Sequence, residues 1–137
     1  MDEKLASVVI DEITNLKKKE FKGSRKQDNE DKELNLRISD CHINWLYPAQ
    51  PNITGIFEVG NARYLAEGSV NLRTKRISFR YHEVDSSKGV DKPIVYYHLY
   101  EGNLEKNKND LYSIKNGTWK KLNSDIEGTF EMTEKSE

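Results

Sequence analysis

The sequence predicts a mainly β protein: an N-terminal amphipathic helix, then seven or eight antiparallel strands in meander order that form a curled sheet or a small β-barrel. Apolar residues recur at helical spacing only near the N-terminus, and from Leu34 onward they alternate with polar residues. Glycines stand inside three of the expected strands, at Gly55, Gly68 and Gly128. Glycine is disfavoured there unless the sheet bends or another backbone approaches closely.

Composition indicates one folded domain that needs no disulfide. Seven Tyr, four Phe and two Trp are too many aromatic side chains for a disordered chain of 137 residues. The net charge of −1 lacks the basic excess that is typical of general nucleic-acid binders. The single cysteine, Cys41, has no partner for an intramolecular disulfide, and no signal or membrane-spanning segment is visible. We therefore expect a cytoplasmic protein without nucleic-acid or membrane partners.

The helix is expected within residues 1–21, because one stripe of apolar side chains recurs there at a period of 3.6 residues. This stripe must pack on the sheet of this chain or on another protein. Residues 22–33 are almost entirely polar, and we expect a solvated linker there. The stripe consists of Leu5, Val8, Val9, Ile13 and Leu16.

The β domain is expected to span residues 34–132, and a flexible tail to follow over residues 133–137. The alternation slips by one residue near Asp40 and Cys41, which predicts a β-bulge or a bend. Cys41 is more typical of a small buried side chain than of a nucleophile. The Asn116-Gly117 dipeptide predicts a hairpin turn, because both residues tolerate positive φ.

One expected strand, residues 94–100, is apolar or aromatic on both faces. If Tyr96, His98 and Tyr100 point inward, they line a ligand pocket with a few polar groups. If they point outward, they form an exposed aromatic surface for a partner protein. A third interpretation buries both faces, one in the sheet and the other under the helix.

A basic group on the hairpin around residue 76 is a second place for binding. Arg76, Arg80 and His82 share one face of the expected strand. That face is either an ordinary solvated surface, with Glu67 as an ion-pair partner on the neighbouring strand, or a site for a phosphate or carboxylate group.

We expect no metal and no cofactor. The three histidines lack the spacing of a zinc site, and the adjacent Cys41 and His42 point to opposite faces of a strand. No phosphate-binding glycine loop and no nucleophile elbow occur.

Two short motifs near the end of the chain, Gly117-Thr118-Trp119 and Gly128-Thr129-Phe130, resemble strand pairs of lipocalin-like (calycin) and avidin-type barrels. In those families a Gly-x-Trp strand closes the barrel floor, and later Gly-x-aromatic strands curl around it. The families place their Gly-x-Trp near the first strand, whereas Trp119 stands near the end. The resemblance implies a closed or nearly closed barrel, and it carries over no binding residue.

Three classes of function remain open. The first is a non-catalytic binding domain that takes a small or extended ligand at the barrel interior or mouth. The second is a protein-interaction module, such as an inhibitor, immunity-type or accessory protein, that binds through the aromatic strand or the helix. The third is an enzyme, although no catalytic residue can be assigned; homodimers through an exposed strand edge also remain open. The candidate ligand-binding residues are Tyr81, Tyr96, His98, Tyr100, Trp119 and Arg80.

Overall fold

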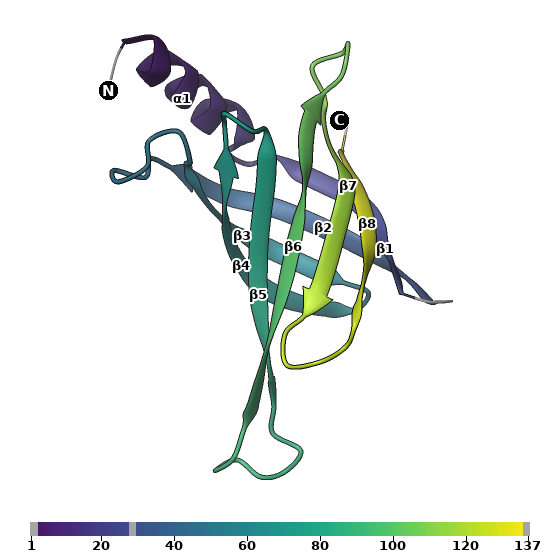
Figure 1. Cartoon of the computed structure of the whole chain (residues 1–137). Coiled ribbons are helices and arrows are strands. Elements are labelled where there is room, and N and C mark those ends of the chain that lie inside the picture. The colour runs from purple at the N-terminus through teal and green to yellow at the C-terminus, as the bar shows by residue number, and fades with distance from the viewer. Residues whose placement is uncertain (1–2, 28–29, 136–137) are drawn as a thin grey trace.

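The computed structural model describes residues 3–27 and 30–135, and it shows a closed antiparallel β-barrel of eight strands with one helix before them (Figure 1). Each strand pairs with its neighbours in sequence, and the last strand pairs with the first. The predicted mainly β meander is therefore confirmed. The elements are α1 (Glu3–Leu16), β1 (Glu20–Gln27), β2 (Glu30–His42), β3 (Asn52–Val59), β4 (Ala62–Asn71), β5 (Arg76–Asp85), β6 (Ile94–Lys106), β7 (Tyr112–Lys121) and β8 (Glu127–Glu134).

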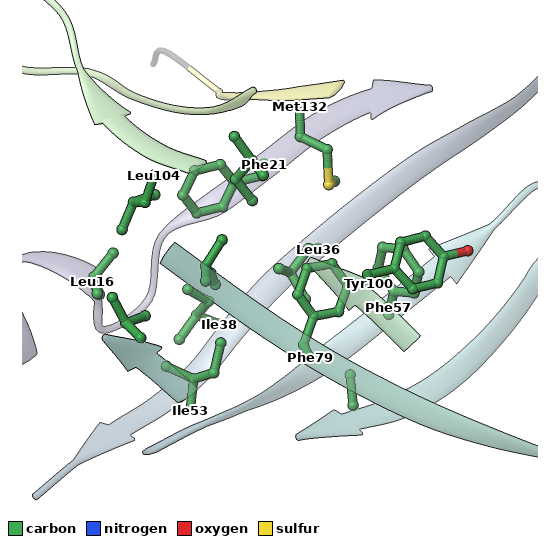
Figure 2. Packing of buried hydrophobic residues seen from close by; sticks show 14 of the residues in the cluster. Leu16, Phe21, Leu36, Ile38, Ile53, Phe57, Phe79, Tyr100, Leu104 and Met132 are labelled. Atoms are coloured by element: carbon green, nitrogen blue, oxygen red, sulfur yellow. The ribbon is translucent and has the colours of Figure 1, made fainter. Parts of the chain in front are cut away.

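Aromatic rings fill the middle of the barrel. The ring centroids of Phe57 and Phe79 lie 5.1 Å apart, and Tyr100 lies 4.9 Å from Phe57 and 5.2 Å from Phe79. Figure 2 shows this cluster continuing from Tyr100 towards Leu16, with the Tyr100 hydroxyl pointing away from the apolar side chains. Because the centre is packed, the interior of the barrel has space for a ligand only towards one of its ends.

The helix α1 packs on the barrel of its own chain and covers one end of it (Figure 1). Val9 and Leu16 are fully buried, and Leu5 and Ile13 pack against the core. Val8, however, is 45% exposed, so its assignment to the buried stripe was wrong. The helix also ends at Leu16, before the predicted end at residue 21, because β1 begins at Glu20.

The predicted linker over residues 22–33 is instead the hairpin of β1 and β2, and that prediction was wrong. Residues 28 and 29 lie outside the described part of this hairpin. The strand β1 hydrogen-bonds to β2 on one side and to β8 on the other. Backbone pairing on both sides stabilises a strand that has few apolar side chains of its own. Its inward positions are occupied by Phe21, Gly23 and Arg25.

Two irregularities in the ladders were only partly predicted. The register of β2 against β3 shifts between Ile38 and Asp40, which confirms the expected bulge. Asn116-Gly117 does not form the predicted hairpin turn, because it lies inside β7. The positive φ of Asn116, 52°, serves a bulge there, where the pairing with β8 shifts between Ile114 and Gly117.

The other end of the predicted β domain also differs from the structure. The expected flexible tail begins at residue 133, but β8 continues to Glu134, and Thr133 pairs with Lys22 of β1. The tail prediction was therefore wrong for these two residues, while residues 136 and 137 lie outside the described ranges.

Cys41 is buried as expected, and burial raises the pKa of its thiol to about 11.

Strand glycines allow the sheet to coil tightly. A methyl group added at Gly68 of β4 would collide with the backbone oxygen of Ser78 on β5. One added at Gly128 of β8 would collide with the backbone oxygen of Lys26 on β1. These contacts explain why glycine occurs within strands where it otherwise weakens the sheet.

We predict that Gly68→Ala destabilises the barrel by about 1–3 kcal/mol, because the added methyl group meets backbone that cannot rotate away. Urea unfolding followed by circular dichroism measures the change. Gly60→Asn is the control, because Gly60 has open space around it and a φ of 58°, which Asn tolerates. Equal stability of Gly68→Ala and wild type would contradict the role given to this close approach.

Candidate ligand-binding site at the barrel mouth

The barrel end opposite α1 holds a cavity of about 230 Å³. The odd-numbered strands end there and the even-numbered strands begin there, so nearly every strand supplies a side chain. Figure 1 shows β5 and β6 continuing beyond this end as a long hairpin. We call this end the mouth. Its cavity is lined by Arg25, Gln27, Lys32, Val59, Ala62, Tyr64, Tyr81, Glu83, His98, Trp119, Lys121 and Ile126.

The two-sided strand β6 directs its polar aromatic residues inward. His98 and Tyr100 are buried, and Tyr96 is partly buried. Tyr97, between them, lies on the outer surface and is 44% exposed. The interpretation in which the Tyr-His-Tyr face is exposed to a partner protein was therefore wrong. The inward orientation places His98 in the wall of the mouth.

Three stacked rings from neighbouring strands form one wall of the mouth. The Tyr64 and Tyr81 ring centroids lie 4.2 Å apart with their planes 18° apart. The His98 ring also stacks on Tyr81, with the ring centroids 4.4 Å apart and the planes 11° apart. The strand register explains the contact between Tyr81 and His98, because these two residues pair directly across β5 and β6.

His98 is held in its neutral form. Burial lowers the pKa of its imidazole, although the hydrogen bond with Glu83 acts in the opposite direction. Nε2 lies 2.9 Å from Glu83 Oε2, so the neutral ring carries its proton on Nε2 and donates it to the carboxylate. Nδ1 is buried and has no hydrogen-bond partner among the described residues. Protonation would therefore bury a charged N–H without an acceptor.

The same geometry limits what His98 can do chemically. Its outward nitrogen already faces Glu83, and Nδ1 is sealed from solvent, so neither nitrogen is placed to take a proton from a molecule in the cavity. The cavity lining contains no serine, threonine or cysteine as a nucleophile in the described part of the chain. The His98–Glu83 pair thus acts as a rigid element of the wall.

Arg25 is the side chain of the mouth that sequence analysis missed. It comes from the segment that was predicted to be a linker, yet it is only 8% exposed. Its Nη1 donates a hydrogen bond to the Tyr100 hydroxyl at 2.7 Å, and its guanidinium carbon lies 4.1 Å above the Trp119 ring. The alternation of Phe21, Gly23 and Arg25 with charged or polar neighbours was the signal that could have placed it inside a barrel.

The Tyr100 hydroxyl connects the aromatic core to Arg25. It accepts a hydrogen bond from Arg25 Nη1 at 2.7 Å, and the Tyr81 ring lies 5.9 Å from the Tyr100 ring. Burial raises the pKa of both tyrosines, so both hydroxyls keep their protons at neutral pH. The result is a preformed polar floor beneath the mouth, above the aromatic core.

The remaining predicted residues divide between the mouth and the outer surface. Trp119 lines the cavity. Tyr96 lies beside its rim, with Lys121 Nζ 4.2 Å from the centre of its ring. Arg80 faces outward instead and forms an exposed ion pair with Glu67 at 3.1 Å. It is therefore not part of the mouth, because odd and even positions of β5 point to opposite faces, and its role as an anion partner stays a prediction.

No protein-family model, curated protein or solved structure matches this chain. Within residues 3–27 and 30–135, no group of three or more metal-ligating side chains is present. The single helix of the described chain is too short and too polar to span a membrane. A function is therefore inferred from the geometry of the mouth alone.

We predict that the wild type loses stability as the pH falls from about 7.5 to about 5, and that His98→Phe loses less. The folded state lowers the pKa of His98, so the unfolded chain binds the proton more readily and acid favours unfolding. Urea unfolding of both proteins at the two pH values measures the difference. An identical loss in both proteins would show that His98 does not titrate as the structure implies.

Proposed function

We propose that this protein is a non-catalytic binding domain that takes a small ligand at the mouth of its barrel. The observation that carries the proposal is the cavity bounded by stacked Tyr64, Tyr81 and His98 on one side and by Trp119 on another. Small-molecule sites combine such apolar walls with a few fixed polar groups. Here the polar groups are held by hydrogen bonds before any ligand arrives.

The size of the cavity restricts the ligand. A volume of about 230 Å³ is below the usual range of roughly 300–1,000 Å³ for sites that enclose drug-sized molecules. The packed rings of Phe57, Phe79 and Tyr100 leave no continuation of this space into the barrel centre. A ligand of about one ring system fits, with part of its surface left in solvent.

The architecture supports a lipocalin-like mode of binding as part of this proposal. Eight strands in simple meander order close one barrel, and one end is covered by a helix while the other is open. In such an arrangement the open end is the natural entrance for a ligand.

A protein-interaction module is the second candidate, and an outer surface favours it. Leu65, Tyr97 and Leu122 line a shallow hollow on the outside of the barrel, and Leu65 is 83% exposed. Exposed apolar side chains that gather in one place mark interaction surfaces. The helix contributes less to this candidate, because its apolar stripe packs on its own barrel.

Trp119 provides a direct test of the mouth. Trp45→Phe removes the other tryptophan, which is 81% exposed, and leaves Trp119 as the single fluorescent reporter in the cavity wall. We expect compounds from a metabolite library that raise the melting temperature also to change Trp119 emission.

A blocking variant makes the test specific. Ala62→Trp places a large ring at the cavity entrance and should abolish both effects, whereas Leu65→Trp, on the outer face of the same strand, should abolish neither. A library without a single stabilising compound, or stabilising compounds that still bind Ala62→Trp, would overturn the proposed function.

A further inference from the structure

The cations and carboxylates that line the mouth are not balanced. Three cationic side chains line the cavity, and Glu83 is the only carboxylate among the described lining residues. Glu83 already faces His98 at 2.9 Å and Lys121 at 3.9 Å. Lys32 pairs with Glu30 at 3.7 Å on the exposed rim. Within the described ranges, this leaves Arg25 as the lining cation without a carboxylate partner.

Burial makes this unpaired charge costly. Arg25 is 8% exposed, and a guanidinium removed from water without a counter-ion loses hydration that a hydrogen bond to a hydroxyl only partly replaces. The face of Trp119 offsets a further part through a cation–π contact. A guanidinium has five N–H donors, and among residues 3–27 and 30–135 one of them is hydrogen-bonded, to Tyr100. The group therefore retains donors and charge for an anion in the cavity.

The charge of Arg25 acts on the whole mouth. It opposes the effect of burial on the pKa of Tyr64, Tyr81 and Tyr100, and it adds to the lowering of the His98 pKa. Lys121 also lowers the His98 pKa, while the Glu83 carboxylate raises it by more than either cation lowers it. Because Glu83 is already shared by His98 and Lys121, an anionic group that lies next to Arg25 meets the charge of that cation directly.

We infer that the ligand of the mouth is a small aromatic acid whose oxyanion pairs with Arg25 while its ring packs on the aromatic wall. This inference rests on the proposed function and names the chemical class of its ligand. The fork of a guanidinium matches the two oxygens of a carboxylate, and it also accepts a phosphate group. The small cavity favours a single ring over a longer chain.

Matched probes separate charge from shape. Benzoate and benzamide have nearly the same size, and only benzoate carries the negative charge; phenyl phosphate tests the other oxyanion. We expect NMR titration of the ¹⁵N-labelled full chain to show benzoate shifting the amide signals of mouth residues. Benzamide should bind about tenfold more weakly or worse, because it leaves the charge of Arg25 unpaired. Tighter binding of phenyl phosphate than of benzoate would assign the site to phosphate esters within the same class.

Two arginines on opposite faces of the barrel give a matched pair of variants. Arg25→Met should weaken benzoate binding about tenfold or more, and Arg80→Met, on the outer surface, should leave it unchanged. Without ligand, Arg25→Met should melt at the same temperature as wild type or higher, because it removes a buried unpaired charge. Arg25→Gln serves as the neutral variant if Arg25→Met does not fold.

The acid nearest to Arg25 in sequence is Asp28, which lies outside the described ranges. Asp28→Asn should leave benzoate affinity unchanged. About tenfold tighter binding in Asp28→Asn would show that the chain supplies its own counter-ion, and it would overturn the inference. Equal binding of benzoate and benzamide, or undiminished benzoate binding in Arg25→Met, would also overturn it, while the library result with Ala62→Trp would still decide the proposed function.

Discussion

The pairing of β1 with β8 is the constraint on which the rest of this structure depends. It runs from Phe21 opposite Glu134 to Lys26 opposite Thr129, and it turns an open meander into a barrel. Closure supplies hydrogen bonds to both edges of β1, so a strand with few apolar residues becomes part of the wall. It also fixes which side chains of β1 point inward, and in this way brings Arg25 over Trp119.

The two ends of the barrel differ because the side chains that lie there differ in polarity. At one end, Val9 and Leu16 of α1 complete the apolar core. At the other, the apolar layer stops at Tyr100, whose hydroxyl begins a polar floor. The mouth therefore has a packed base and an open top, which agrees with the proposed binding of a small molecule.

Sequence periodicity predicted most of the fold, because a strand that is buried on one face alternates apolar and polar residues. The bulge near Asp40 followed from the same reasoning. It failed where pairing rather than burial determines structure: β1 has too few apolar residues to show a period, and Asn116-Gly117 suits a bulge as well as a turn. Local patterns cannot distinguish these cases, because the deciding partner, β8, comes at the far end of the chain.

The candidate site was predictable only in part for the same reason. The inward residues of β6 were identified as one of the possibilities, since their aromatic character is visible in the sequence. Arg80 was selected because it belongs to a basic group on one strand face, whereas Arg25 fell in the predicted linker, and its proximity to Trp119 exists only across the closed barrel. The alternation of Phe21, Gly23 and Arg25 with polar neighbours is a local signal for a strand, but it does not show which side chains the cation meets across the barrel.

The contacts of Trp119 extend beyond the cavity wall. Its indole N–H donates to the backbone oxygen of Lys26 at 3.3 Å, its ring lies against Gly128, and the Arg25 guanidinium lies over it. This side chain of β7 thus contacts both β1 and β8, the two strands whose pairing closes the barrel. Any molecule that immobilises this indole also tightens the seam between the first and last strands. Occupancy of the mouth would then slow amide hydrogen exchange along β1 and β8, including residues that do not line the cavity.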